Sequence, residues 1–331
     1  MSKGWNIHGA TNLPEIRDII KEEEALDPVE YFADRILPPI PVTQPMAKIK
    51  VITAGQDRKL VESARASNGG YNRVKWAMGS DYYETSVYGI EADWDNMEAL
   101  ANASIEVDEQ AMAGAIVVGI VKTNRDARVS EAVFNTTVFT GVDYYSDETA
   151  NKWSLKTTIV LDRLTLGQKK LFKRYGLRLQ NLDLLCHPDL IAKLADNIAS
   201  EDGISQTTAV KLMTVAEQEE IVRKRFGLKS VVSLLAAYND MPFSPDPENP
   251  GSSNYTDIFP TTMAMLCVLS DGRKGFGGIG LGWQPVFTKM TDDFEVEQYA
   301  EPGTDGQVIR AKEWRGVKVN KNWGFLFNNV M

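Results

Sequence analysis

The sequence predicts an α+β fold, which combines strand-rich and helical segments. Four observations lead to this prediction. Apolar and polar residues alternate with a period of two between residues 47 and 94, which is typical of strands. One long helical pattern follows at residues 107–135, and the last third of the 331-residue chain returns to strand-like segments. Residues 159–240 alternate helix and strand.

Residues 1–46 are predicted to form an N-terminal arm that stays outside the core. The segment "LPEIRDIIKEEEALDPV" (13–29) has room for one or two short helices, and the triplet Glu22–Glu24 is expected on a solvated helix face. Prolines then crowd positions 38 to 45, where they favour extended backbone and remove the donors of a strand ladder.

Residues 47–92 are predicted to form an extended loop built on paired strands. In "AKIKVITAG", Ile49 and Val51 alternate with lysines, and "YNRVKWAMGSDYYETSVYGIEADW" is rich in aromatic and β-branched residues. A two-stranded ribbon has no second layer to cover its aromatic face, and isolated ribbons are marginally stable in water. We therefore expect a neighbouring subunit to cover this ribbon.

Residues 107–135 carry the strongest helical pattern in the chain. Apolar and small residues recur at spacings of three and four, and Asp108 and Glu109 lie at the start, where the helix dipole favours negative charge. At 1.5 Å per residue such a helix is roughly 40 Å long, which is longer than a compact domain usually requires.

Residues 159–240 are predicted to form a compact α/β unit. One of its helices begins at Pro188, and another has Thr214 and Glu217 at the spacing of a capping box. The unit closes with a single strand, "LKSVVSLLAAYND" (228–240). A proline-rich loop follows, and the rest of the chain is predicted to be strands that carry Trp283, Trp314 and Trp323.

Composition excludes several classes of protein. The net charge of -9 argues against a protein that holds nucleic acid through its overall field, because phosphate contacts need a local surplus of Lys and Arg. No apolar run approaches the roughly 18 residues that a bilayer span needs, so no membrane partner is expected and synthesis in a cytosol follows. Cys186 and Cys267 lie in apolar segments and are expected to be buried thiols rather than a disulfide.

One enzymatic alternative rests on Gly275–Gly280, where "GFGGIG" matches the G-x-G-x-x-G pattern of dinucleotide-binding proteins. That chemistry requires a helix that begins at the last glycine, so that its N-terminus meets the phosphates. Pro285 and a period-two pattern follow instead, and little chain remains for the rest of such a domain. We expect a turn between strands, and a nucleotide-dependent oxidoreductase stays as a distant alternative.

No catalytic, cofactor-binding or metal site is predicted, and we do not expect the chain to be an enzyme. Its two histidines are His8, in the arm, and His187, beside Cys186. Consecutive residues of a strand point to opposite faces, so this pair favours neither metal ligation nor thiolate activation.

Three segments occur in an informative order: a strand then helix, "LDLLCHPDLIAKLADN"; a helix, Phe-Gly turn and strand, "AEQEEIVRKRFGLKSVVSLLAAYN"; and closing strands, "GQVIRAKEWRGVKVNKNWGFLFNNV". Together with the arm, ribbon and long helix before them, they resemble the major capsid proteins of tailed phages. This Hong Kong 97-like fold is shared with encapsulin nanocompartments. Each motif is a weak pattern of residues that pack in the core, and no single one identifies the family. The segments are specific for the family because they occur in this order.

The resemblance implies a division of the chain into an arm, a loop and two domains. In the family the extended loop lies over the next subunit, which implies subunit contacts at Tyr71, Val74, Trp76 and Tyr83. The implied parts are the arm (1–46), the extended loop (47–92), the peripheral domain (93–180 and 285–315, with a spine helix at 107–135) and the axial domain (181–284 and 316–331).

The resemblance also implies a function. The chain is expected to assemble with itself, as pentamers and hexamers, into the icosahedral head shell of a tailed phage that encloses double-stranded DNA without binding it tightly. A separate scaffolding protein, a portal and a decoration or cement protein are further candidate partners. The expected location is the virion capsid, assembled in the host cytoplasm. An encapsulin-type bacterial compartment is the nearest alternative.

Overall fold

The computed structural model of the chain describes ten stretches of residues. These are 11–12, 30–52, 78–95, 109–156, 158–201, 213–239, 255–270, 280–287, 294–300 and 306–331.

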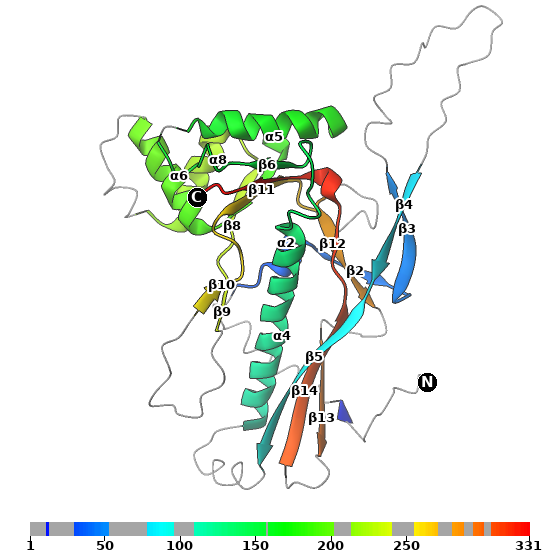
Figure 1. The fold of residues 1–331 in the computed structure, drawn as a ribbon. Coiled ribbons are helices and arrows are strands. Elements are labelled where there is room, and N and C mark those ends of the chain that lie inside the picture. The colour runs from blue at the N-terminus through cyan, green and yellow to red at the C-terminus, as the bar shows by residue number, and fades with distance from the viewer. Residues whose placement is uncertain are drawn as a thin grey trace, which may run out of the picture.

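The α/β unit predicted at 159–240 contributes two strands, β7 and β8, to a five-stranded sheet in the order β6-β16-β11-β7-β8, and the other three strands come from outside that range. The central strand β11 pairs antiparallel with both β16 and β7. Three helices, α5, α6 and α8, lie around this sheet at one end of the molecule (Figure 1). The bounds are β6 Tyr145–Asp147, β7 Asp183–Cys186, β8 Ser230–Ser233, β11 Met263–Cys267, β16 Gly324–Asn328, α5 Val160–Tyr175, α6 Pro188–Glu201 and α8 Val215–Phe226.

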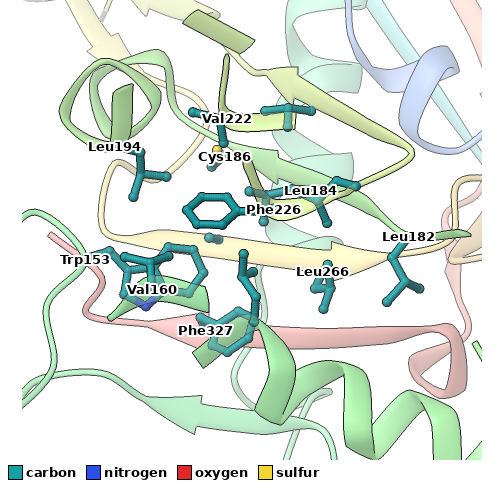
Figure 2. Close-up of a cluster of buried hydrophobic side chains, with 14 of the residues drawn as sticks. Trp153, Val160, Leu182, Leu184, Cys186, Leu194, Val222, Phe226, Leu266 and Phe327 are labelled. Atoms are coloured by element: carbon teal, nitrogen blue, oxygen red, sulfur yellow. The ribbon is translucent and has the colours of Figure 1, made fainter. Parts of the chain in front are cut away.

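Alternate residues of this sheet enter two different cores, because successive side chains of a strand point to opposite faces. Leu184, Leu266 and Phe327 pack in one core with apolar side chains from α5, α6 and α8 (Figure 2). Their sequence neighbours Leu185 and Met265 pack in the other core. That second core also contains side chains from α2 (Ala33–Ile36) and from the C-terminal end of α4 (Glu109–Val133). The sheet is therefore covered on both faces.

A second, seven-stranded sheet has the main order β1-β13-β14-β12-β15, with β5 paired to β14 and β2 paired to β12. The long helix predicted at 107–135 is confirmed over Glu109–Val133, as α4, and it runs alongside this sheet (Figure 1). Val117, Val118 and Val121 pack against Val296 and Ile309. The bounds are β1 Thr11–Asn12, β2 Pro39–Val42, β5 Ser86–Asp95, β12 Gly282–Phe287, β13 Glu295–Ala300, β14 Gly306–Arg315 and β15 Lys318–Val319.

The predicted ribbon is present as β3 (Met46–Ile52) paired antiparallel with β4 (Met78–Glu84). It projects away from the rest of the molecule (Figure 1). Strand β5 differs from the expectation, because it pairs with β14 along its whole length, from Ser86 to Asp95. Residues 86–92 therefore belong to the seven-stranded sheet and are not part of the projecting ribbon.

The expectation that residues 1–46 stay outside the core is wrong for residues 32–42. Phe32, Ile36 and Leu37 are buried in the core beneath the five-stranded sheet. The prolines do not prevent β2 from pairing in parallel with β12, because carbonyl groups still accept: Gln284 N–H donates to Pro38 O at 3.1 Å.

The segment predicted as one strand at 228–240 forms two strands. Strand β8 belongs to the five-stranded sheet, whereas β9 (Ala237–Asn239) pairs with β10 (Tyr255–Asp257) in a separate two-stranded sheet. The predicted capping box is confirmed, because the Thr214 and Glu217 side chains each bond the backbone of the other residue at the start of α8.

Candidate assembly surfaces

A buried ionic cluster joins the N-terminal segment, the spine helix α4 and the large sheet. Glu313 of β14 has no exposed surface and accepts from Arg125 Nε at 2.9 Å and from Arg128, both on α4. Asp34 of α2 accepts from Arg315 Nη1 at 2.9 Å. Burial lowers the pKa of Arg315 to about 10, so this guanidinium stays charged at neutral pH. Buried charges persist only when paired, so these contacts fix the three parts relative to one another.

Asp126 makes a second connection between α4 and the N-terminal segment. Its carboxylate accepts from the backbone N–H groups of Phe32 and Ala33, which begin α2. Burial raises the pKa of Asp126 to about 6, although these hydrogen bonds act in the opposite direction. Sequence reasoning missed both connections. Their members are about 90 to 280 residues apart in the chain, and no local pattern links them.

The glycine motif does not have the surroundings of a phosphate site. Residues 275–279 lie outside the described part of the chain, and β12 begins at Gly282, so a strand occupies the place where the chemistry needs a helix N-terminus. Gly280 has a φ of 155°, and a Cβ there would lie 2.5 Å from Ser270 Cβ. This glycine is explained by close backbone approach between segments.

Cys186 and Cys267 are buried free thiols, as predicted, and burial raises the pKa of both. His187 is also buried, and its Nδ1 accepts from the backbone N–H of Asp189 at 3.3 Å. Within the described ranges no three His, Cys, Asp or Glu side chains cluster as metal ligands would. A helix both long and apolar enough to cross a membrane is likewise absent from those ranges.

The projecting ribbon carries one of the four predicted contact residues within the described part of the chain. Tyr83 is buried against Val42 and Ile49, and its hydroxyl donates to Gln44 O at 3.1 Å. Its ring is therefore already covered by its own chain. The exposed aromatic of this strand is the neighbouring Tyr82, which faces the other side. The other three predicted contacts lie outside the described residues: Tyr71, Val74 and Trp76.

The spine helix exposes an apolar stripe on the side away from the sheet. Met112, Ile116 and Ile120 are 54%, 44% and 37% exposed, and their spacing of four places them in one row. Asn124 continues the row as a polar residue. The spacing was visible in the sequence, but the buried row of the same helix has equally apolar residues, so the pattern alone did not tell which row is covered.

No family model matches the chain, and no curated protein matches its sequence. Solved structures match it over nearly its whole length. A phage-related protein from Bordetella bronchiseptica has a TM-score of 0.65 at 12% identity, covering 97% of each chain. The mature capsid of bacteriophage PhiM1 has a TM-score of 0.55 at 11% identity, covering 91% of this chain and 87% of the other.

The SrpI encapsulin from Synechococcus elongatus has a TM-score of 0.52 at 11% identity, covering 99% of this chain and 92% of the other. At such identities the likeness concerns the fold. The Hong Kong 97-like fold inferred from the sequence is thereby confirmed.

Proposed function

We propose that this chain is the shell-forming subunit of a tailed-phage head. The observation that carries the proposal is the fold that it shares, over nearly its full length, with the PhiM1 capsid. The subunit assembles as pentamers and hexamers into an icosahedral shell around packaged double-stranded DNA, in the host cytoplasm, and remains in the virion. A scaffolding protein, a portal and a decoration or cement protein are its proposed partners, and it has no enzymatic role.

Two surfaces support assembly with further copies. The apolar stripe Met112, Ile116 and Ile120 and the projecting β3–β4 ribbon are both left uncovered by the described chain. Burial of such surface is favourable by roughly 25 cal/mol per Å² of apolar area. Repeated around closed symmetry, many individually weak contacts hold a shell together. The extended loop is proposed to supply subunit contacts through Tyr71, Val74 and Trp76. Tyr83 contributes only the small part of its surface that its own chain leaves exposed.

The charge of the chain suits a container for DNA. With a net charge of -9, the subunit lacks the cationic surplus that would hold phosphates over a whole inner surface. The enclosed genome would therefore be confined by the wall and not bound tightly to it.

An encapsulin-type compartment is the second candidate, because the SrpI encapsulin shares the fold. The contents of particles purified from the native source distinguish the two. DNA that nucleases cannot reach supports the phage head. Particles that hold a protein cargo and no DNA support the compartment.

The test of shell formation is negative-stain microscopy of the purified chain, alone and after co-expression with a scaffolding protein. We expect capsomers, tubes or closed shells. If the chain remains a monomer or dimer under every condition, the proposal is wrong.

A pair of variants on one row of α4 sharpens this test. Ile116→Asp places a charge in the apolar stripe and is expected to reduce particle yield at least tenfold, since buried unpaired charge is costly. Asn124→Asp adds the same charge at a polar position of that row and is expected to assemble normally. Circular dichroism of both variants checks that the fold is retained.

A further inference from the structure

Helix α5 has an exposed face that combines apolar and basic side chains. Its other face is buried through Leu164, Gly167 and Leu171, which pack in the α/β core. On the outer face Leu161, Leu166 and Phe172 are each at least 37% exposed. Large apolar side chains gathered on a surface mark a site of interaction more often than charged ones do.

The same region concentrates positive charge on an otherwise acidic chain. Residues 152–178 contain eight Lys or Arg and one Asp. Arg163 and Lys170 are already paired, with Glu148 and Asp143. Lys169, Lys173 and Arg178 have no carboxylate within ion-pair distance among the described residues. They line, with Leu166 and Phe172, a shallow groove of about 520 Å³.

This combination favours a protein occupant. Phosphate groups would pair with the lysines but would leave the leucines and Phe172 in water, whereas an acidic amphipathic helix would cover both kinds of side chain. Residues 13–29 of this chain have that composition, with six acidic and two basic residues. Ile16, Ile19 and Ile20 have the spacing of one helix face. This segment lies outside the described residues.

We propose that the outer face of α5 binds residues 13–29 of a second copy of this chain. The inference rests on the proposed function, because a shell places copies side by side. The isoleucines cover Leu161, Leu166 and Phe172, and the triplet Glu22–Glu24 pairs with Lys169 and Lys173. Exposed ion pairs are screened by salt, so the contact weakens as ionic strength rises.

Zero-length cross-linking of the full chain tests the contact directly. A carbodiimide joins a lysine amine to a carboxylate that touches it. Chains grown on ¹⁴N and on ¹⁵N are mixed before assembly and allowed to assemble together, and the cross-linked peptides are identified by mass spectrometry. Mixed-isotope links from Lys169 or Lys173 to Glu22–Glu24 are expected, and the exposed Lys193 of α6 serves as a lysine that should not link to the arm. Absence of mixed-isotope links between the arm and α5 overturns the proposal.

Charge reversal provides an independent measurement. Lys169→Glu with Lys173→Glu is expected to reduce hydrogen-exchange protection of residues 13–29 at least tenfold, and reversing Glu22–Glu24 to Lys in the same chain should restore it. Lys193→Glu with Lys224→Glu is the matched control, with the same change in charge at exposed positions of α6 and α8. If the α5 variant instead loses affinity for duplex DNA while arm protection is unchanged, the face is a nucleic-acid surface and the proposal is wrong.

Microscopy of the same samples separates this proposal from the shell function. Shells without links between the arm and α5 contradict only the docking of the arm. Mixed-isotope links without any particle support the docking and contradict the shell.

Discussion

Asp126 Oδ1 accepts a hydrogen bond from the backbone N–H of Ala33 at 2.7 Å, although the two residues are 93 positions apart. Through this contact the spine helix caps the first turn of α2. The N-terminal segment therefore enters the fold with a fixed direction, and its attachment depends on a buried carboxylate.

The first prediction concerns the pH dependence of that attachment. Burial raises the pKa of Asp126 to about 6, so the folded chain binds this proton more tightly than the unfolded chain does. The ionised form is thus penalised in the fold, and stability falls as pH rises from about 4 to 6. Asp126→Asn keeps the acceptor without the charge. As pH falls from 7 to 4.5, we expect the free energy of unfolding of the wild type to rise by about 1–3 kcal/mol relative to that of this variant. Urea unfolding measures both.

Asp147→Asn is the control with the opposite sign. Hydrogen bonds from Thr149 and Asn329 lower the pKa of exposed Asp147, so its contribution is present above the ordinary carboxylate range and is lost only below it. The difference in free energy of unfolding between the wild type and this variant should therefore stay constant between pH 7 and pH 4.5. A parallel response of the two variants would contradict the assignment to Asp126.

The second prediction concerns the ionic cluster. Glu313→Gln removes the buried anion that the buried Arg125 shares with the partly exposed Arg128, and breaking a buried pair costs about 3–5 kcal/mol. Glu297→Gln, on neighbouring strand β13, removes a carboxylate paired with Arg310 at 2.7 Å, but both partners are in part solvated. Its expected cost is about 1 kcal/mol or less. Equal shifts in the urea midpoints of the two variants would show that the cluster does not fix the three parts.

The sequence predicted the parts of this fold whose signal is local. The spacing in α4, the Thr214 capping box and the buried strand before Pro188 each depend on residues within a few turns of one another. The ordered resemblance then supplied the architecture. The prediction was wrong for residues 32–42. The prolines nearby in the sequence indicate an arm, but the pairing of this segment with β12 is set by partners about 245 residues away. The candidate surfaces were predicted only in part, because exposure depends on which face the rest of the chain covers.

The third prediction compares two glycines in helix interiors. A Cβ at Gly119 of α4 would meet only Tyr31 Oη, at 3.8 Å, so Gly119→Ala should stabilise the chain by about 0.5–1 kcal/mol through helix propensity. A Cβ at Gly167 of α5 would lie 2.9 Å from Phe327 Cζ and 3.1 Å from Phe325 Cδ1. Gly167→Ala should destabilise by about 1–3 kcal/mol, because an overpacked core has to shift. Thermal unfolding measures both, and a gain for Gly167→Ala would contradict the close packing of α5 on β16.

The last prediction concerns the two thiols. Cys186 and Cys267 are at most 1% exposed, and burial raises their pKa, so neither forms the reactive thiolate at neutral pH. In the folded chain a thiol reagent at pH 8 is expected to label neither residue within an hour, and in urea it should label both. The rate of labelling then reports opening of the five-stranded sheet, since Cys186 lies in β7 and Cys267 in β11. Fast labelling of Cys267 alone in the native chain would mean that β11 opens independently, which its central position between β16 and β7 argues against.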